Sequence, residues 1–141
     1  MNQPVEDETV TLARQHFAVR QTHRLRQLVA WAAHRVGLDR ERGHDLELAV
    51  TEAASNVIRY GGGHGRLDLL RDDDRALIAE ISDDGPGMAT DLPAALPPAD
   101  RSGGRGLYLI EQSCDHVEYR TGPAGTTVHL EVNLHHEQDQ P

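Results

Sequence analysis

Two polar side chains interrupt the small and apolar stretch AVTEAASNVIRYGGG at residues 49–63, where Glu52 and Asn56 stand four residues apart. On a helix this spacing places both side chains on one face, about 40° apart. The face adjoins an apolar stripe that includes Ala53 and Val57, so we expect a half-buried polar pair along the rim of the core. An ordinary pair of solvated or mutually hydrogen-bonded side chains would have the same spacing.

The motif DDGPGM at residues 83–88 follows an expected strand and carries an aspartate beside two glycines. Asp83 would offer a fixed carboxylate acceptor, which suits the exocyclic amine of a planar ligand. Gly85 and Gly87 would let such a ligand approach the backbone closely, because no Cβ stands in the way. A plain surface turn uses the same residue types, so this motif alone leaves both interpretations open.

A third motif, SGGRG at residues 102–106, precedes an expected helix. Gly103, Gly104 and Gly106 around Arg105 could present backbone N–H groups and a helix N-terminus to phosphates. A flexible loop with a helix cap has the same composition. All 14 lysine or arginine positions are arginine, and the missing lysine excludes a P-loop, so a nucleotide site here must be of another kind.

Helical periodicity predicts the elements that carry these motifs. One helix runs from Thr22, its expected N-cap, to a stop at Gly37. A second begins after the capping residue Asp39 and stops at the glycines 61–63. A third helix is expected over residues 106–114.

Alternating or short apolar runs predict the strands. They are expected at residues 66–71, 76–82, 117–120 and 127–134, the first two joined as a hairpin through 72–74. Residues 9–19 fit a short strand and an early helical turn equally poorly, so both remain open. Residues 88–104 contain three prolines and are expected to form a loop.

Hairpin strands with helices grouped between them predict an α+β fold, a two-layer sandwich whose mostly antiparallel sheet is covered by helices on one face. With 141 residues the chain is long enough for one core and too short for two ordinary domains. We therefore expect a single domain over residues 9–134, with disordered ends at 1–8 and 135–141.

Charge and composition argue against several classes of function. A net charge of −9 argues against direct binding to nucleic acid, whose phosphates are bound by clustered cations. No apolar run is long enough to span a membrane and the N-terminus is polar and acidic, so we expect a cytoplasmic protein without a signal peptide. Cys114 is expected to be a buried, inert thiol, and the nine histidines lack the spacing of a metal site on an expected helix.

Taken together and in this order, the motifs resemble those of the GHKL ATP-binding superfamily. E-x-x-x-N at 52–56, D-x-G-x-G at 83–87, G-x-G-L at 104–107 and GTT at 125–127 resemble its N box, its two glycine boxes and its closing motif. An isolated domain of this length looks like the small bacterial anti-sigma-factor serine/threonine kinases of the RsbW, SpoIIAB or RsbT type. The resemblance implies a Bergerat-type ATP-binding fold, with ATP and Mg²⁺ as cofactors.

The resemblance implies roles for the two polar residues of the second helix. Asn56 would supply an amide oxygen to Mg²⁺, a hard ion that uses few protein ligands and several waters and phosphate oxygens. Glu52 would lie near the γ-phosphate and accept the proton of a partner's serine hydroxyl as general base.

The same resemblance implies an adenine pocket around the second motif. Asp83 would accept a hydrogen bond from the adenine amine. Gly85 and Gly87 would let the chain run under the base, and Thr126 or Thr127 would complete the contact from a neighbouring strand.

The third motif would surround the phosphates. Gly104 and Gly106 would close that side of the nucleotide. Arg101 or Arg105 would act as a charge clamp in place of the absent lysine.

The resemblance finally implies an enzyme with two protein partners. It would transfer the γ-phosphoryl group of ATP to a serine or threonine of an anti-sigma-factor antagonist of the STAS type, and in its other state hold a sigma factor away from RNA polymerase. The alternative is a nucleotide-binding regulatory module that binds partners without significant kinase activity. Whether the chain forms a homodimer, as some relatives do, is left open.

Overall fold

The computed structural model describes residues 9–18, 21–60, 63–83, 110–122 and 125–134. Two helices and five strands have defined bounds in this part of the chain: β1 Thr9–Ala18, α1 Thr22–Val36, α2 Arg40–Tyr60, β2 His64–Asp72, β3 Ala76–Ser82, β4 His116–Gly122 and β5 Gly125–Asn133. Residues 110–113 are also helical.

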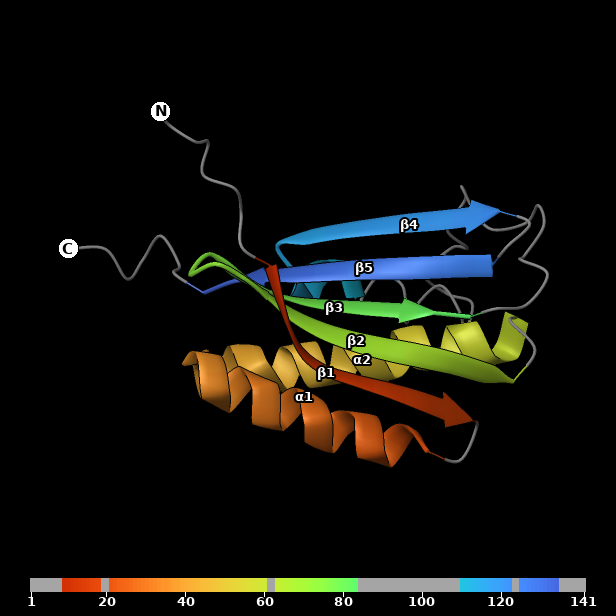
Figure 1. The fold of residues 1–141 in the computed structure, drawn as a ribbon, viewed down its shortest axis with the longest axis horizontal. Helices are drawn as coiled ribbons and strands as arrows, with labels where there is room; N and C mark the ends of the chain where they lie inside the picture. Colours follow the sequence, from red (N-terminus) through yellow and green to blue (C-terminus); the bar gives the residue numbers. More distant parts are fainter. Residues whose placement is uncertain (1–8, 19–20, 61–62, 84–109, 123–124, 135–141) are drawn as a thin grey trace.

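The five strands form one antiparallel sheet in the order β1-β2-β3-β5-β4. Both long helices lie on one face of this sheet, with α2 against its central strands and α1 against α2 and the β1 edge (Figure 1). The predicted α+β sandwich of two layers is therefore confirmed.

The core fills the space between the helices and the sheet. Burial alternates residue by residue along β5, which buries Val128, Leu130 and Val132. From the facing helix α2, Leu46 and Val50 are completely buried. Burying an aliphatic side chain of this size stabilises a fold by about 1.5–3 kcal/mol, so these contacts hold the two layers together.

The helix α1 ends as predicted but begins differently. Thr22, the expected N-cap, is the first helical residue, and Gln21 before it is the N-cap without a side-chain bond to the helix. The reason is local, because the Gln21 side chain accepts a hydrogen bond from the Ala18 N–H at 2.9 Å and so belongs to the connection from β1. At the other end Gly37 adopts the left-handed conformation with φ 82°, and its N–H donates to the carbonyl of His34.

The helix α2 begins and ends as its sequence predicts. The Oδ1 atom of Asp39 accepts a hydrogen bond from the Arg42 N–H at 2.9 Å, which makes it the expected cap. After Tyr60 the chain turns at Gly63, whose φ of 92° is left-handed and whose N–H donates to the carbonyl of Ile58.

The segment that the sequence left open is the strand β1. It pairs along the whole of β2, and Phe17 lies opposite Gly65. A Cβ at Gly65 would lie 2.6 Å from the Cζ atom of Phe17, so the aromatic ring is buried across a strand that needs glycine at this position. Cross-strand pairing, which leaves no local signature in residues 9–19, decides this element.

The strands β2, β4 and β5 are longer at their N-terminal ends than predicted, and β3 has the predicted bounds. Cys114 and Leu134, expected inside a helix and a strand, lie just beyond those elements. After Cys114 the Asp115 N–H already donates to the carbonyl of Glu131 on β5, and the Leu134 N–H donates to the carbonyl of Arg75 in the β2–β3 turn. Tertiary hydrogen bonds therefore end both elements early.

Several predictions concern residues outside the described part of the chain. These are the disordered ends 1–8 and 135–141, the loop 88–104 and the first half of the third helix. Within the described residues, no helix has both the length and the apolar character needed to cross a bilayer.

Candidate functional site

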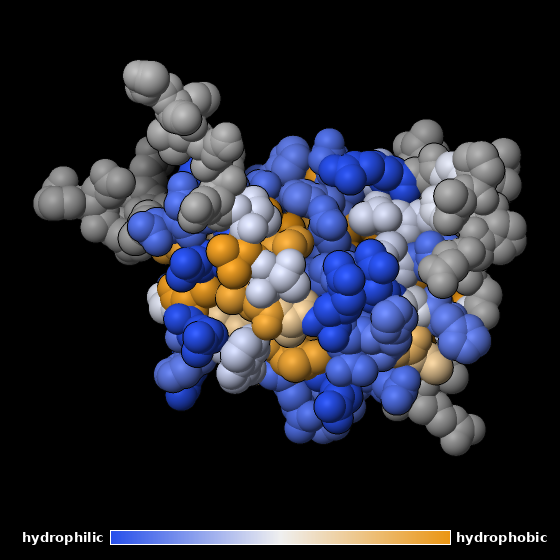
Figure 2. Space-filling model, viewed as in Figure 1, coloured by the Kyte–Doolittle hydropathy of each residue, from blue (hydrophilic) through white to orange (hydrophobic). Residues whose placement is uncertain are grey.

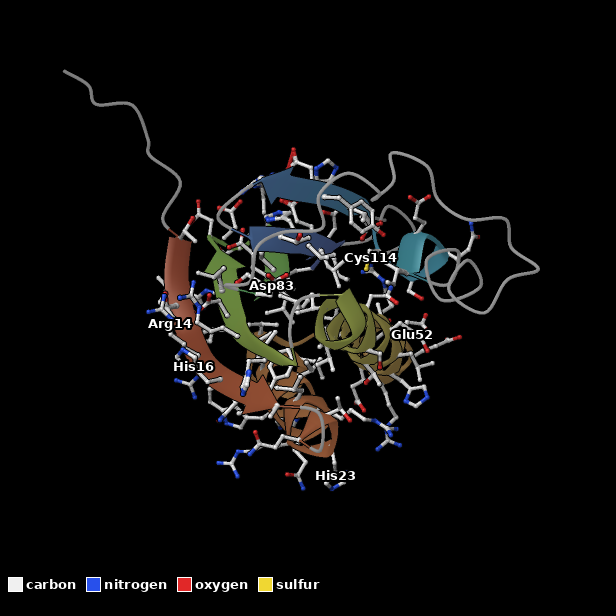
Figure 3. The ribbon with its side chains drawn as sticks, turned by 90° about the vertical axis from the view of Figure 1, so that its right-hand side faces the viewer. Arg14, His16, His23, Glu52, Asp83 and Cys114 are labelled. Atoms are coloured by element: carbon white, nitrogen blue, oxygen red, sulfur yellow. The ribbon has the colours of Figure 1, made fainter. Side chains whose placement is uncertain are left out.

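The polar pair of α2 lies on the rim of the core, as expected. Glu52 and Asn56 are both half-buried, whereas Ala53 and Val57 beside them are buried. Figure 3 shows Glu52 on the side of α2 that is turned away from β1 and β2, on the same side of the molecule as residues 110–113. The predicted half-burial of this pair is confirmed.

Asp83 comes directly after β3 and is only 5% exposed. Its N–H donates to the carbonyl of Thr126 at 3.0 Å, which continues the β3–β5 ladder one step beyond Ser82 and Thr127. Thr126 is itself 4% exposed. This backbone hydrogen bond between β3 and β5 fixes the position of Asp83.

A residue that the sequence did not single out shapes the surroundings of Asp83. Gly125 begins β5 with φ 132°, a conformation that side chains rarely adopt. A Cβ there would lie 2.2 Å from the Asp83 carbonyl oxygen and 3.4 Å from its Oδ1 atom. Only glycine fits, because the two backbones approach so closely. The motif GTT contains this glycine, but nothing local in the sequence shows that it contacts Asp83.

Topology brings the two parts of the site to one end of the sandwich. The chain leaves α2 at Tyr60 and enters β2 at His64, so the C-terminal end of α2 lies beside the start of β2. Antiparallel pairing sets Ser82 opposite Arg66, which places the end of β3 at that same end of the sheet. The C-terminal end of α2, Asp83 and Thr126 therefore lie toward the same end of the sandwich although they are far apart in the sequence.

Residues 110–115, which lead into β4, are held to the rest of the fold at both ends. Ile110 is completely buried in the core. At the other end, the Asp115 carboxylate accepts hydrogen bonds from the Arg42 guanidinium at 2.5 Å and from the Asn133 N–H at 2.7 Å. One carboxylate thus joins this segment to the start of α2 and the end of β5.

Cys114 belongs to that anchored segment and is half-buried there, not fully buried as expected. Burial raises the pKa of its thiol to about 12, and the nearby carboxylates of Asp115 and Asp45 act in the same direction. The thiol is therefore protonated at neutral pH, which supports the expectation that it is inert.

Six of the predicted site residues lie outside the described part of the chain, namely Gly85, Gly87, Arg101, Gly104, Arg105 and Gly106. Of the other four, Asp83 and Thr126 are joined by a backbone hydrogen bond, and Glu52 and Asn56 share one helix. Among the described residues, no group of three or more histidine, cysteine or acidic side chains is arranged to hold a metal ion.

Comparison with known families decides what kind of fold surrounds this site. Residues 16–132 match the family described as the histidine kinase-like ATPase domain. The chain belongs to this family. The match includes both parts of the site, α2 and the end of β3, and it agrees with the resemblance to GHKL proteins read from the motifs.

Solved structures share the fold of this histidine kinase-like ATPase domain. A structure of the RsbU and RsbW domains of Rv1364c from Mycobacterium tuberculosis aligns with a TM-score of 0.62 at 17% identity, over 86% of this chain and 32% of that one. The SiaB–SiaC complex from Pseudomonas aeruginosa aligns with a TM-score of 0.64 at 11% identity, over 86% of this chain and 89% of the other.

The histidine kinase AdeS from Acinetobacter baumannii aligns with a TM-score of 0.53 at 18% identity, over 89% of this chain and 69% of that one. At identities this low, the alignments show a shared fold alone. This chain spans about a third of the length of the Mycobacterium chain. No curated protein gives a significant match.

Proposed function

We propose that this protein is an ATP-dependent anti-sigma-factor regulator that phosphorylates a serine or threonine of a STAS-type antagonist and, in its other state, sequesters a sigma factor. The observation that carries the proposal is the position of a buried aspartate, an asparagine and a glutamate at one end of a histidine kinase-like ATPase domain. Each residue has the chemistry that one part of the reaction needs.

Asp83 is suited to read the adenine base. Its carboxylate accepts hydrogen bonds only, so it matches the amine of adenine and not the carbonyl oxygen that guanine has in that place. The close approach of Gly125 fixes the Asp83 backbone, so the side chain needs little rearrangement to bind. Thr126 beside it would add its hydroxyl to the same contact, and Gly85 and Gly87 would run under the base.

Asn56 is suited to hold Mg²⁺ together with the phosphates. The described residues provide no cluster of carboxylates or histidines for a metal, so the ion would depend on an amide oxygen, phosphate oxygens and water. Mg²⁺ bound there would neutralise charge on the phosphates. Gly104, Gly106 and either Arg101 or Arg105 are proposed to bind the phosphate groups.

Glu52 is suited to act as the general base. It lies one helical turn before Asn56 and is half-buried, so it would face the γ-phosphate side of the nucleotide. Its carboxylate would take the proton from the partner's hydroxyl while that oxygen bonds to the γ-phosphorus and ADP departs. Bound ATP supplies the phosphoryl group.

The identity of the partners is the most specific part of the proposal. Two chains of similar fold are an RsbW domain studied together with an RsbU domain, and SiaB in complex with SiaC. In both structures this fold occurs together with a second protein or domain, which supports a function that depends on protein partners. We propose that this chain acts in the cytoplasm, where sigma factors and their antagonists are found, and that it does not bind nucleic acid directly.

The test is incubation of the purified protein with ATP labelled in the γ-phosphate and with STAS-domain antagonists of the same organism. We expect the label to appear on a serine or threonine of one antagonist, only when Mg²⁺ is present. Nucleotide binding without labelled antagonist would instead favour a regulatory module that uses ATP as a ligand only. A protein that binds no nucleotide would contradict both functions.

A further inference from the structure

The exposed face of α1 differs in charge from the rest of the molecule. The helix has arginines and histidines at five positions and no carboxylate, although the whole chain has a net charge of −9. All five basic positions are exposed: His23, Arg24, Arg26, His34 and Arg35. The exposed face of this helix is thus basic in an otherwise acidic protein.

A tryptophan stands in the middle of this basic face. Trp31 is the only tryptophan of the chain and is 45% exposed, more than any other large apolar side chain among the described residues. Arg24 and Arg35 lie seven positions before and four after it, which places all three on one line along the helix. The Arg35 guanidinium stacks over the indole ring, 5.6 Å from its centroid.

The line of three residues is separate from the candidate nucleotide site. Figure 1 shows α1 at the outer side of the helical layer, beside the edge strand β1. Figure 3 places His23 of α1 at the surface, well away from Asp83 and Glu52. The Arg24 guanidinium also donates to the Gln15 side chain of β1 at 3.2 Å, which steadies the end of this surface.

We propose that Arg24, Trp31 and Arg35 form a docking surface for an acidic region of a partner protein. Arginine and tryptophan are the residues that most often dominate binding at protein interfaces, and a basic surface on an acidic chain selects partners of opposite charge. Figure 2 shows the strand side of the molecule, which is mostly hydrophilic, with apolar side chains gathered to the left of its centre.

Nucleic acid is a poorer match for the same surface. Binding to a phosphate backbone releases counterions in proportion to the number of phosphates that are neutralised, and here α1 supplies three arginines while the chain as a whole is acidic. An acidic patch on a folded protein needs only a few matched cations and an apolar anchor.

The identity of the partner rests on the proposed function, because the candidates are the STAS-type antagonist and the sigma factor. The experiment uses protein labelled with fluorotryptophan, so that Trp31 gives the only fluorine NMR resonance in the mixture. Purified antagonists and sigma factors of the same organism are titrated in, first with ATP and Mg²⁺ and then with ADP, and dissociation constants are also measured by calorimetry.

Two arginines of the same helix provide a matched pair of variants. Arg24→Glu reverses a charge on the line with Trp31. Arg26→Glu makes the same change at the border of the exposed face of α1, away from that line. Arg24 is the third residue of α1, where glutamate interacts favourably with the helix dipole, so this variant should fold normally. Trp31→Ala removes the apolar anchor and is followed by calorimetry.

We expect the Trp31 resonance to shift when a partner binds and Arg24→Glu to weaken that binding by about tenfold or more, with Arg26→Glu changing it by less than about threefold. Added salt should weaken binding of the unchanged protein more than that of Arg24→Glu. If Arg24→Glu and Trp31→Ala bind as tightly as Arg26→Glu, the surface is wrong and the proposed function stands. If the unchanged protein binds neither antagonist nor sigma factor, both proposals are wrong.

Discussion

At the scale of single residues, Glu52 and Asn56 show how a polar pair can be recognised from its spacing and its apolar neighbours. The pair lies at helix positions that border the buried stripe of α2. Both side chains are half-buried beside buried alanine and valine, so they are held in place without being sealed from a ligand. This combination suits groups that must meet a nucleotide.

Removing the Glu52 carboxylate should separate binding from chemistry. Glu52→Gln keeps the size of the side chain and removes the base, so nucleotide affinity should change little while phosphoryl transfer to the antagonist falls by about 10²–10⁴-fold. Glu47→Gln makes the same change elsewhere on α2, at another half-buried position, and should leave the transfer rate unaltered. Full activity of Glu52→Gln would assign this residue to structure alone.

Gly125 provides a test of how tightly Asp83 is positioned. In Gly125→Ala the new Cβ would meet the Asp83 carbonyl oxygen, so the end of β3 must move and ATP affinity should fall by about tenfold or more, with a loss of about 1–3 kcal/mol in stability from backbone strain. Gly122→Ala is the matched control, because Gly122 pairs with Gly125 and a Cβ there meets nothing within 4 Å. Equal ATP affinity in the two variants would contradict the proposed adenine pocket.

At the scale of elements, α2 connects the core to the site. Its N-terminus is capped by Asp39 and joined to the rest of the fold through Arg42, which donates to Asp115 and to the carbonyl of Asn133. Its C-terminal half carries Glu52 and Asn56. The cap and the polar pair lie in different halves of one helix. The stability of the first turns and the geometry of the site can therefore be tested separately.

Asp39→Ala should destabilise the fold without changing the site. Loss of the cap leaves the Arg42 N–H without its acceptor, so the free energy of unfolding in urea should fall by about 1 kcal/mol. Asp74→Ala removes the same charge from an exposed turn and should have a smaller effect. Nucleotide affinity at low temperature should be the same in both variants. A large loss of affinity in Asp39→Ala alone would mean that the start of α2 contributes to the site.

At the scale of the whole molecule, the site lies at one end of a sandwich whose stability should respond to a ligand. Nucleotide that binds only the folded state at 100 times its dissociation constant adds about 2.7 kcal/mol to the free energy of unfolding. We therefore expect ATP with Mg²⁺ to raise the melting temperature by several degrees. GTP with Mg²⁺ should raise it much less, because Asp83 would face a carbonyl oxygen. Equal shifts would exclude Asp83 as the residue that selects adenine.

Much of this protein can be predicted from local patterns of residues. The periodicity of the helices, the alternation in β5 and the stops at Gly37 and Gly63 are local signals, because they follow from backbone geometry and side-chain burial within one element. The spaced motifs likewise predicted the family to which the chain belongs, and they singled out Glu52, Asn56 and Asp83 as candidate site residues.

Other features depend on contacts between distant segments, and these became visible in the folded chain alone. Residues 9–18 became a strand because β2 pairs with them, and Gln21 replaced Thr22 as N-cap because its side chain binds the connection from β1. The closeness of Gly125 to Asp83 arises where β5 passes the end of β3. Such contacts are set by packing and strand order, which have no counterpart in the local pattern of residues.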